Sequence, residues 1–501
     1  MSTASPGLPA AVSETHVSYV FFTADRAYKL KKPVSMPFLD FSTVQARQVA
    51  CEREVALNRR LAPDVYEGVA TVLDPDGQVC DHLVVMRRLP GDRSLESLIR
   101  DADETVEDEL KAIAHLLANF HATADRSTEV DQAASIETVR GNWGANTVEL
   151  QPFCDHFLDP AVVARVDDLA RRYLAGREEL FAERIAAGRA VDGHGDLLAG
   201  DVFCLDDGPR VLDCLEFSDR LRYCDVLGDV AFLAMDIERL GRPDLAAAFL
   251  STYRDATGDD WPDSLAHHWI AYRAQVRAKV ACLRWSESGG PGKEDPRALL
   301  SIALAHLESA TIRLVLVGGL PGTGKSTLAA GLAQTLGWDV LRSDVVRKEL
   351  SGIKPTASAE APLGSGLYRP EVTSATYAEM LRRARGLLAN GHSVVLDATW
   401  NTRSLREAAV LLATEAHAEL VELRCAAPFE VTTSRIEARR ANSSDPSDAT
   451  VEVAAALADE ADPWPGAVVI DTAGTPKAAL DQARQVLVTR LGGGSNQPGY
   501  E

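Results

Sequence analysis

The sequence predicts an α+β domain, with a β-rich N-terminal lobe and a helical C-terminal lobe, followed by an α/β domain with a parallel sheet. The chain has 501 residues, more than one hydrophobic core usually holds. Short β-prone runs mark residues 1–92 and helical periodicity marks residues 93–305, so the two lobes form one predicted domain, 1–305. Strands and helices alternate over residues 311–490, which indicates a parallel sheet with helices on both faces.

In the N-terminal lobe, apolar residues recur at helical spacing over Phe41–Ala62, and Ser42 is a plausible N-cap for that helix. The strands of this lobe are expected at Tyr19–Thr23, Arg26–Lys31 and Leu83–Met86. The C-terminal lobe is expected to contain a strand-like stretch, Val191–Glu216, and helices at Leu110–His121, Val162–Ala187, Asp219–Leu240, Leu265–Ser286 and Pro296–Ala310.

The second domain is expected to begin its alternation with an apolar strand that runs directly into a glycine-rich turn and a helix. Its strands are expected at Arg313–Val317, Asp339–Leu341, Ser393–Asp397, Glu419–Arg424 and Ala467–Asp471. Residues 491–501 are rich in glycine and polar residues, and we expect this tail to be disordered.

Charge and composition disfavour several classes of function. The formal net charge is −21, and most of it belongs to residues 1–310. Such acidity disfavours binding to nucleic acid or to anionic membranes. The eight cysteines lack metal-ligand spacing, no apolar run reaches the roughly 18 residues that span a bilayer, and the N-terminus lacks a signal-peptide pattern. A cytoplasmic protein is therefore expected, with its oligomeric state left open.

The strongest motif is Gly319–Ser326, which fits G-x-x-x-x-G-K-[ST] between an expected strand and an expected helix. In that setting the Lys325 side chain reaches the β- and γ-phosphates of ATP, and the Ser326 hydroxyl ligates Mg²⁺. The residues predicted to cradle the phosphates are Gly319, Leu320, Pro321, Gly322, Thr323, Gly324, Lys325, Ser326 and Thr327.

Acidic residues follow two further strands of the same sheet. Asp344 stands where parallel sheets bind ligands, and its carboxylate can accept the proton of an attacking hydroxyl, with Arg347 clamping an anionic substrate group. The alternative is that Asp344 only caps the following helix. Asp397 ends the next apolar strand, where it can hold a Mg²⁺-bound water or face the substrate.

Arg435 and Arg439 are four residues apart and share one helical face. An arginine-bearing segment over the γ-phosphate would stabilise charge that develops in the transition state. The alternative is an ordinary charged helix, in which these arginines pair with Glu437.

These motifs, GLPGTGKST, RSDVVRKEL, SVVLDATW and RIEARR, resemble the kinase branch of P-loop proteins that includes zeta toxin, gluconate kinase and the kinase domain of phage polynucleotide kinase. The resemblance covers residues 311–490. It implies that Asp344 is the general base, that Arg347 contacts substrate, and that Arg435 and Arg439 belong to a lid. It leaves the acceptor open, because this branch phosphorylates sugars, nucleotide-sugars and nucleic-acid ends alike.

The N-terminal domain carries His194-Gly-Asp196 and, a short loop later, Asp213 at the end of an apolar stretch. Two carboxylates at this spacing suit a base and a metal ligand on either side of one phosphoryl group. His121 is interpreted as a packed core histidine. The helix Tyr272–Trp285 carries Arg273, Arg277 and Lys279, and it is interpreted as a solvated face. The alternative is that it faces the acceptor site of this domain.

These N-terminal motifs resemble the aminoglycoside phosphotransferase family, which has the protein-kinase-like fold. The resemblance implies that Asp196 is the catalytic Asp and Asp213 a metal ligand. It also implies that Lys29 pairs with ATP phosphates and is anchored by Glu54, with Lys31 and Glu52 one step away as alternatives.

Two features depart from this family. Asp201 stands where the family has Asn as a second metal ligand, and a carboxylate there can still bind Mg²⁺. No glycine lies between Gly7 and Gly68, so a glycine loop over the phosphates is absent from the sequence. The alternative that this domain binds a ligand or a partner without catalysing a reaction therefore stays open.

Together these patterns predict an ATP- and Mg²⁺-dependent phosphotransferase that acts on a hydroxyl of a small molecule. The P-loop domain is expected to be catalytic, and the kinase-like domain is either a second catalyst or the module that selects the acceptor. One alternative is a nucleotide-dependent switch with a nonenzymatic binding domain. The other is a nucleic-acid 5′-hydroxyl kinase, which the charge disfavours.

Overall fold

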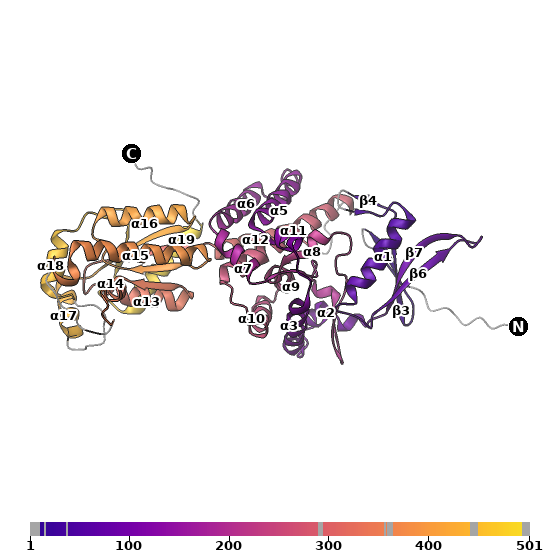
Figure 1. Cartoon of the computed structure of the whole chain (residues 1–501), viewed down its shortest axis with the longest axis horizontal. Coiled ribbons are helices and arrows are strands. Elements are labelled where there is room, and N and C mark those ends of the chain that lie inside the picture. The colour runs from indigo at the N-terminus through magenta and orange to yellow at the C-terminus, as the bar shows by residue number, and fades with distance from the viewer. Residues whose placement is uncertain are drawn as a thin grey trace. The chain divides into compact units, whose positions relative to one another are not determined.

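The computed structural model describes the chain except for residues 1–10, 15–16, 37–38, 289–293, 355–356, 358–363, 441–448 and 493–501. The chain divides into two compact units, coloured mainly indigo to magenta and orange to yellow in Figure 1. The first unit comprises Met1–Asp167, Phe181–Trp261 and Ala266–His306. The second comprises Asp168–Leu180, Pro262–Leu265 and Leu307–Glu501.

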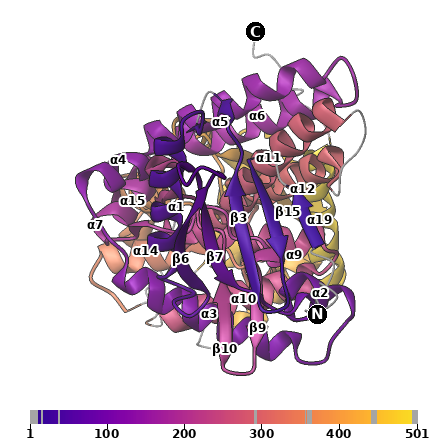
Figure 2. The same ribbon diagram turned by 90° about the vertical axis from the view of Figure 1, so that its right-hand side faces the viewer.

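The first unit begins with an antiparallel sheet in the order β1-β2-β3-β7-β6. Its strands are β1 (Ala11–Glu14), β2 (Ser18–Phe22), β3 (Arg26–Lys31), β6 (Tyr66–Leu73) and β7 (Val79–Arg87). Between β3 and the first helix of the chain lies a small antiparallel pair, β4 (Ser35–Met36) with β5 (Leu39–Asp40). Figure 2 shows β3, β7 and β6 side by side. Helix α1 (Val44–Asn58) buries Cys51 and Val55 against Val84 of this sheet. The cap of α1 is Thr43, whose hydroxyl accepts the Ala46 N–H at 3.1 Å, so the prediction of Ser42 was wrong.

The chain from residue 95 to 309 is mainly helical. Its helices are α2 (Leu95–Arg100), α3 (Val106–Thr123), α4 (Thr128–Ala134), α5 (Ile136–Leu150), α6 (Pro160–Ala175), α7 (Glu178–Ala186), α8 (Asp219–Arg222), α9 (Val226–Arg239), α10 (Pro243–Thr257), α11 (Asp263–Ser288) and α12 (Pro296–Ser309). Short strands interrupt them: β8 (Ala190–Asp192), β9 (Val202–Leu205), β10 (Gly208–Val211) and β11 (Tyr223–Asp225). Single 3-10 turns lie at Gly91–Arg93, Gln151–Phe153, Ala199–Asp201 and, later in the chain, Gly366–Tyr368.

Two predicted helices are broken. The helix expected over Val162–Ala187 ends at Ala175 and restarts at Glu178, with Gly176 at the break, where a glycine commonly ends a helix. The helix expected over Asp219–Leu240 is divided by β11, because Tyr223–Asp225 pairs with β8 instead of continuing the helix. This second break depends on a pairing between segments that lie far apart in the chain, which local periodicity does not report.

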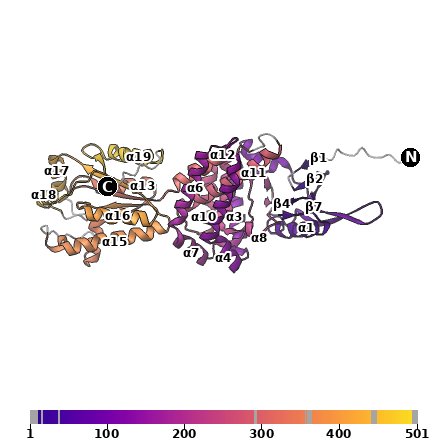
Figure 3. The same cartoon turned by 90° about the horizontal axis from the view of Figure 1, so that it is seen from above.

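The second unit contains a parallel sheet in the order β13-β14-β12-β15-β16. The strands are β12 (Arg313–Gly318), β13 (Asp339–Arg342), β14 (Val394–Asp397), β15 (Glu419–Ala426) and β16 (Val468–Asp471). The helices are α13 (Lys325–Leu336), α14 (Ser343–Leu350), α15 (Pro370–Ala389), α16 (Arg403–Glu415), α17 (Phe429–Arg440), α18 (Val451–Asp459) and α19 (Pro476–Gly492). Figure 3 shows α13 and α19 on one face of the sheet and α15 and α16 on the other. The predicted fold class is confirmed.

The tail predicted to be disordered, 491–501, falls mostly outside the described residues. Helix α19 extends to Gly492, and residues 493–501 are not described. In the described part of the chain, no helix has the length and apolar character needed to cross a bilayer.

Candidate active sites

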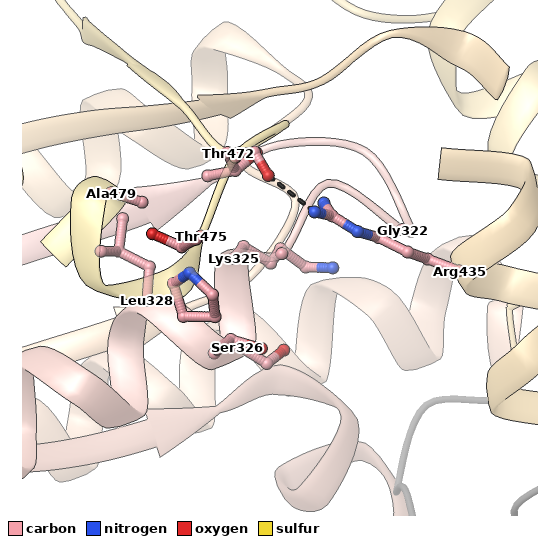
Figure 4. Close-up of a pocket in the computed structure, with 12 residues that line it drawn as sticks. Gly322, Lys325, Ser326, Leu328, Arg435, Thr472, Thr475 and Ala479 are labelled. Carbon is pink, nitrogen blue, oxygen red and sulfur yellow. Dashed lines mark hydrogen bonds between the residues drawn. The ribbon is translucent and has the colours of Figure 1, made fainter. Parts of the chain in front are cut away.

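The first candidate site lies at the carboxyl edge of the parallel sheet. After β12 the chain turns through Gly322 and Gly324, whose φ angles of +81° and +84° are left-handed, and α13 begins at Lys325. A cavity of about 360 Å³ opens over this turn (Figure 4). Its lining comes from the loop, from the start of α13, from α17 and from the segment after β16. The residues are Gly322, Gly324, Lys325, Ser326, Thr327, Leu328, Arg435, Thr472, Gly474, Thr475, Pro476 and Ala479.

Asp397, predicted to hold a Mg²⁺-bound water or to face the substrate, ends β14, the strand next to β12. It pairs in register with Val317, the residue before the last of β12, and its side chain is 3% exposed. Burial raises the pKa of Asp397, while Lys325 and the Ser326 hydroxyl oppose that rise. Its Oδ1 is buried and accepts no hydrogen bond within the described residues, so an oxygen is available there for a cation. Ser326 and Asp397 would together hold Mg²⁺, which neutralises phosphate charge when it is bound.

Asp344 lies in the first turn of α14, one residue after the helix start at Ser343. The N-cap position belongs to Arg342, so the structure does not place Asp344 as the cap. Oδ1 of Asp344 accepts a hydrogen bond from Nη1 of Arg347 at 2.7 Å, which joins the two residues that were singled out as base and clamp. Arg342, at the same sheet edge, approaches Asp397 with its Nε 3.3 Å from Oδ2 of that carboxylate.

Arg435 of α17 extends into the cavity (Figure 4). Its Nη2 donates to the backbone oxygen of Thr472 at 2.7 Å, and a Cβ built on Gly324 would lie 3.6 Å from its Nη1. The guanidinium therefore lies next to the phosphate-binding loop, and among the described residues it forms no ion pair with Glu437. Arg439 lies on the same helix, but its side chain falls outside the described residues.

The second candidate site lies in the first unit, where β3 faces α1. Nζ of Lys29 lies 2.9 Å from Oε1 of Glu54, and Nζ of Lys31 lies 2.7 Å from Oε2 of the same carboxylate. Lys31 also contacts Glu216, and both ends of that pair are buried. Burial opposes the ionisation of Glu54, but Lys29 and Lys31 outweigh it and lower its pKa. The structure thus brings both candidate lysines to Glu54, whereas Glu52 accepts a hydrogen bond from Gln48.

Three aspartates gather beside this pair. Asp213 has a φ of +64°, unusual for a residue other than glycine, and its carboxylate is held by Lys29, which lowers its pKa. Burial, with Asp213 and Asp196 nearby, raises the pKa of Asp201 well above its usual range. This direction favours the neutral acid, which has nearly the size and shape of the asparagine that it replaces.

Oδ1 of Asp213 is engaged by Lys29, so a metal ion would compete with this lysine for that oxygen. Across the described residues, no three or more His, Cys, Asp or Glu side chains gather in a way that could hold a metal ion. The carboxylates predicted as metal ligands in this unit, Asp201 and Asp213, are therefore near one another without forming a complete site.

Asp229, on α9, anchors the loop that carries Asp196. Its carboxylate accepts the backbone N–H groups of His194 and Gly195 at 2.7 and 2.9 Å. His121 approaches the same carboxylate at 3.1 Å, and its other ring nitrogen lies 2.7 Å from the Tyr253 hydroxyl. His121 is thus buried, as expected, but it is also part of a polar network under the loop.

His194 completes the loop that presents Asp196. Burial lowers its pKa to about 4, so the ring is neutral near pH 7. Nε2 then carries the proton that Leu212 O accepts at 3.0 Å, and Nδ1 accepts the Asp196 N–H at 3.4 Å. Neither this network nor the Lys31–Glu216 pair was assigned a role from the sequence. The acids Asp225 and Asp229 at the start of α9 are a sequence signal that could have pointed to the network.

The arginines of α11 contradict their predicted solvated environment. Arg273 and Arg277 are 6% and 5% exposed, because their helix face is covered by α9 and by the loop at Asp196. Nε of Arg273 donates to Gly228 O at 2.8 Å, and Nη1 of Arg277 lies 3.9 Å from Oδ1 of Asp196. The local sequence pattern does not report which segment covers this part of the helix.

Comparison with known proteins assigns the chain to a family. Residues 314–464 match the family described as AAA domain. The protein named "Uncharacterized protein Rv2004c" from Mycobacterium tuberculosis is 45% identical over 475 residues, 95% of each chain. The chain belongs to the family of this mycobacterial protein. A Mycobacterium bovis member of the family, named "Uncharacterized protein Mb2027c", matches with the same identity and coverage.

Parts of this chain also match solved structures. A choline/ethanolamine kinase family protein from Mesorhizobium loti matches 60% of this chain and 87% of its own, with 14% identity and a TM-score of 0.37. A gluconokinase from Sinorhizobium meliloti matches 36% of this chain and 94% of its own, with 17% identity and a TM-score of 0.27.

Proposed function

We propose that the second unit is an ATP- and Mg²⁺-dependent kinase that transfers the γ-phosphoryl group to a hydroxyl of a small molecule. The observation that carries this proposal is that residues suited to four tasks of a kinase lie together at one edge of the parallel sheet. Lys325 suits the phosphates, Ser326 and Asp397 suit the metal, the Asp344–Arg347 pair suits the acceptor, and Arg435 suits the charge that develops during transfer.

In this proposal, Asp344 accepts the proton of the acceptor hydroxyl while that oxygen bonds to phosphorus and the bond to ADP breaks. Arg347 holds Asp344 in place through the 2.7 Å hydrogen bond and presents its remaining N–H groups to the substrate. A pure nucleotide switch has no need of a partly buried carboxylate paired with an arginine at this position, so the kinase is the favoured function.

We further propose that the first unit is a second phosphotransferase site, with Lys29 on the nucleotide phosphates and Asp196 as the base. The Lys29–Glu54 contact at 2.9 Å and the half-buried carboxylate of Asp196 support this assignment. The raised pKa of Asp201 supports it too, because a neutral carboxyl group would keep the local charge close to that of an asparagine.

The test is a panel of small-molecule hydroxyl acceptors incubated with γ-labelled ATP and the full chain. It is run on the wild type, on Lys29→Met and, as a matched control on the neighbouring lysine, on Lys32→Met. Transfer that persists in Lys29→Met belongs to the second unit, and transfer lost there but kept in Lys32→Met belongs to the first. If no acceptor is labelled by the wild type, both kinase assignments are wrong.

Transfer by the first unit is expected to rise as the pH increases through about 6. Burial raises the pKa of Asp196 to about 6 although Arg277 opposes that rise, and only the ionised carboxylate can accept a proton. Arg277→Gln removes the opposing charge and should move the acidic limb of the rate profile to higher pH. Initial rates between pH 5 and 8 check both points. An acidic limb that stays in place in Arg277→Gln would contradict the role of Asp196.

A further inference from the structure

The candidate base of the first unit lies beside a buried arginine. Arg277 is 5% exposed, and its Nη1 lies 3.9 Å from Oδ1 of Asp196. An acceptor whose hydroxyl reaches Asp196 therefore meets a guanidinium about one ion-pair distance away. A guanidinium therefore faces Asp196 on this side, although the chain as a whole carries a net charge of −21.

A carboxylate of the chain itself fills the other side of this arginine. Nη2 of Arg277 donates to both carboxylate oxygens of Glu294, at 2.7 and 2.8 Å, and the Glu294 side chain is 8% exposed. Two more guanidiniums approach the same group: Nη1 of Arg284 at 3.7 Å and Nε of Arg239 at 3.9 Å. We call Arg239, Arg277 and Arg284 the arginine cluster.

The chemistry of the arginine cluster suits an anion. Nε of Arg277 is buried and has no hydrogen-bond acceptor in the described part of the chain, so the cluster retains a donor beyond those used by Glu294. Arg239 is also held by Asp236, at 2.6 Å. Guanidinium groups bind carboxylates and phosphates through paired hydrogen bonds, whereas a cationic ligand would lie against like charges.

We propose that the arginine cluster binds an anionic group, a carboxylate or a phosphate, of a small-molecule acceptor, and that Glu294 occupies this site until the acceptor displaces it. The identity of the ligand as an acceptor rests on the proposed role of Asp196, whereas the binding of the anion does not. Asp295 anchors the start of α12 by accepting the Arg297 N–H at 2.9 Å. The Glu294 side chain can therefore leave the cluster while α12 stays in place.

The experiment measures anion binding to the full chain by titration calorimetry, with saturating ADP to fill the nucleotide sites. The probes are glutarate, inorganic phosphate and choline, which represent a carboxylate, a phosphate and a cation. Glu294→Gln removes the internal competitor. Asp295→Asn is the matched control, because it makes the same charge change one residue away and retains a capping side chain. The double variant Glu294→Gln/Arg284→Gln weakens the cluster at a position that is 42% exposed and tolerant of substitution.

Glu294→Gln should bind glutarate or phosphate at least about tenfold more tightly than the wild type, a change of about 1.4 kcal/mol. Asp295→Asn should bind like the wild type, and the double variant should lose most of the gain. The probe with the larger gain identifies the anionic group. No phosphoryl transfer is measured, so the result is independent of whether either unit is a kinase. Equal affinities in Glu294→Gln and the wild type, an equal gain in Asp295→Asn, or a gain for choline would each overturn the proposal.

Discussion

Asp344→Asn should lower phosphoryl transfer by the second unit at least about a hundredfold, while ATP binding stays within about threefold of the wild type. Asparagine has the size of aspartate and still accepts the hydrogen bond that Arg347 donates at 2.7 Å, so the local geometry is kept. It cannot take a proton from the acceptor hydroxyl, and general bases typically contribute about a hundredfold or more. Single-turnover rates and ATP affinity, measured on the same preparations, separate the two effects.

The matched control for this prediction is Asp339→Asn. Asp339 is the first residue of β13, the strand that leads into α14 and Asp344, and its side chain is 44% exposed. This variant should transfer phosphate like the wild type. Equal loss in both variants would indicate a general effect on the strand, and unchanged transfer in Asp344→Asn would remove Asp344 from its role as the base.

Gly322→Ala should weaken ATP binding to the second unit at least about a hundredfold. Gly322 has a φ of +81°, and a Cβ there would lie 2.6 Å from Thr432 O and 3.0 Å from Cγ1 of Ile436. Both contacts are on α17, the helix that carries Arg435. Relief of the clash moves the loop or α17 away from the arrangement that surrounds the phosphates. Overpacking and a left-handed alanine cost about 1–3 and 1–2 kcal/mol, which together reach this effect.

Gly337→Ala separates the two costs. Gly337 ends α13 with a φ of +68°, but a Cβ there meets nothing within 4 Å. This variant should lose about 1–2 kcal/mol of stability through the left-handed backbone alone, and it should bind ATP like the wild type. Nucleotide titrations and urea unfolding of both variants give the comparison. Normal ATP affinity in Gly322→Ala would show that the loop does not need its observed approach to α17.

The two units differ in how closely their sites follow from the sequence. The phosphate-binding loop is contiguous, and Gly319–Ser326 stands between a strand and a helix that the structure confirms. The alternation of strands and helices also led to the parallel sheet, because the carboxyl ends of parallel strands meet at one edge. The pairing of Asp397 with Val317 and Arg342 follows from that arrangement.

The site in the first unit is assembled from segments that lie far apart in the chain. The contact of Lys29 with Asp213 joins residues 184 positions apart, and the contact of Lys31 with Glu216 joins residues 185 positions apart. The sequence left Lys29 and Lys31 as alternatives, since residues two apart in a strand share a face. In the structure both lysines contact Glu54, so they are not alternatives to each other.

By itself, the sequence determined the two-part architecture, the phosphate-binding loop, and the acidic residues that follow the strands, because each of these depends on local spacing. Tertiary structure alone decided which carboxylates are paired, and it decided that Arg277 is buried between Asp196 and Glu294. The physical reason is that periodicity assigns residues to a common face, whereas the charge and burial of that face depend on the segment that covers it.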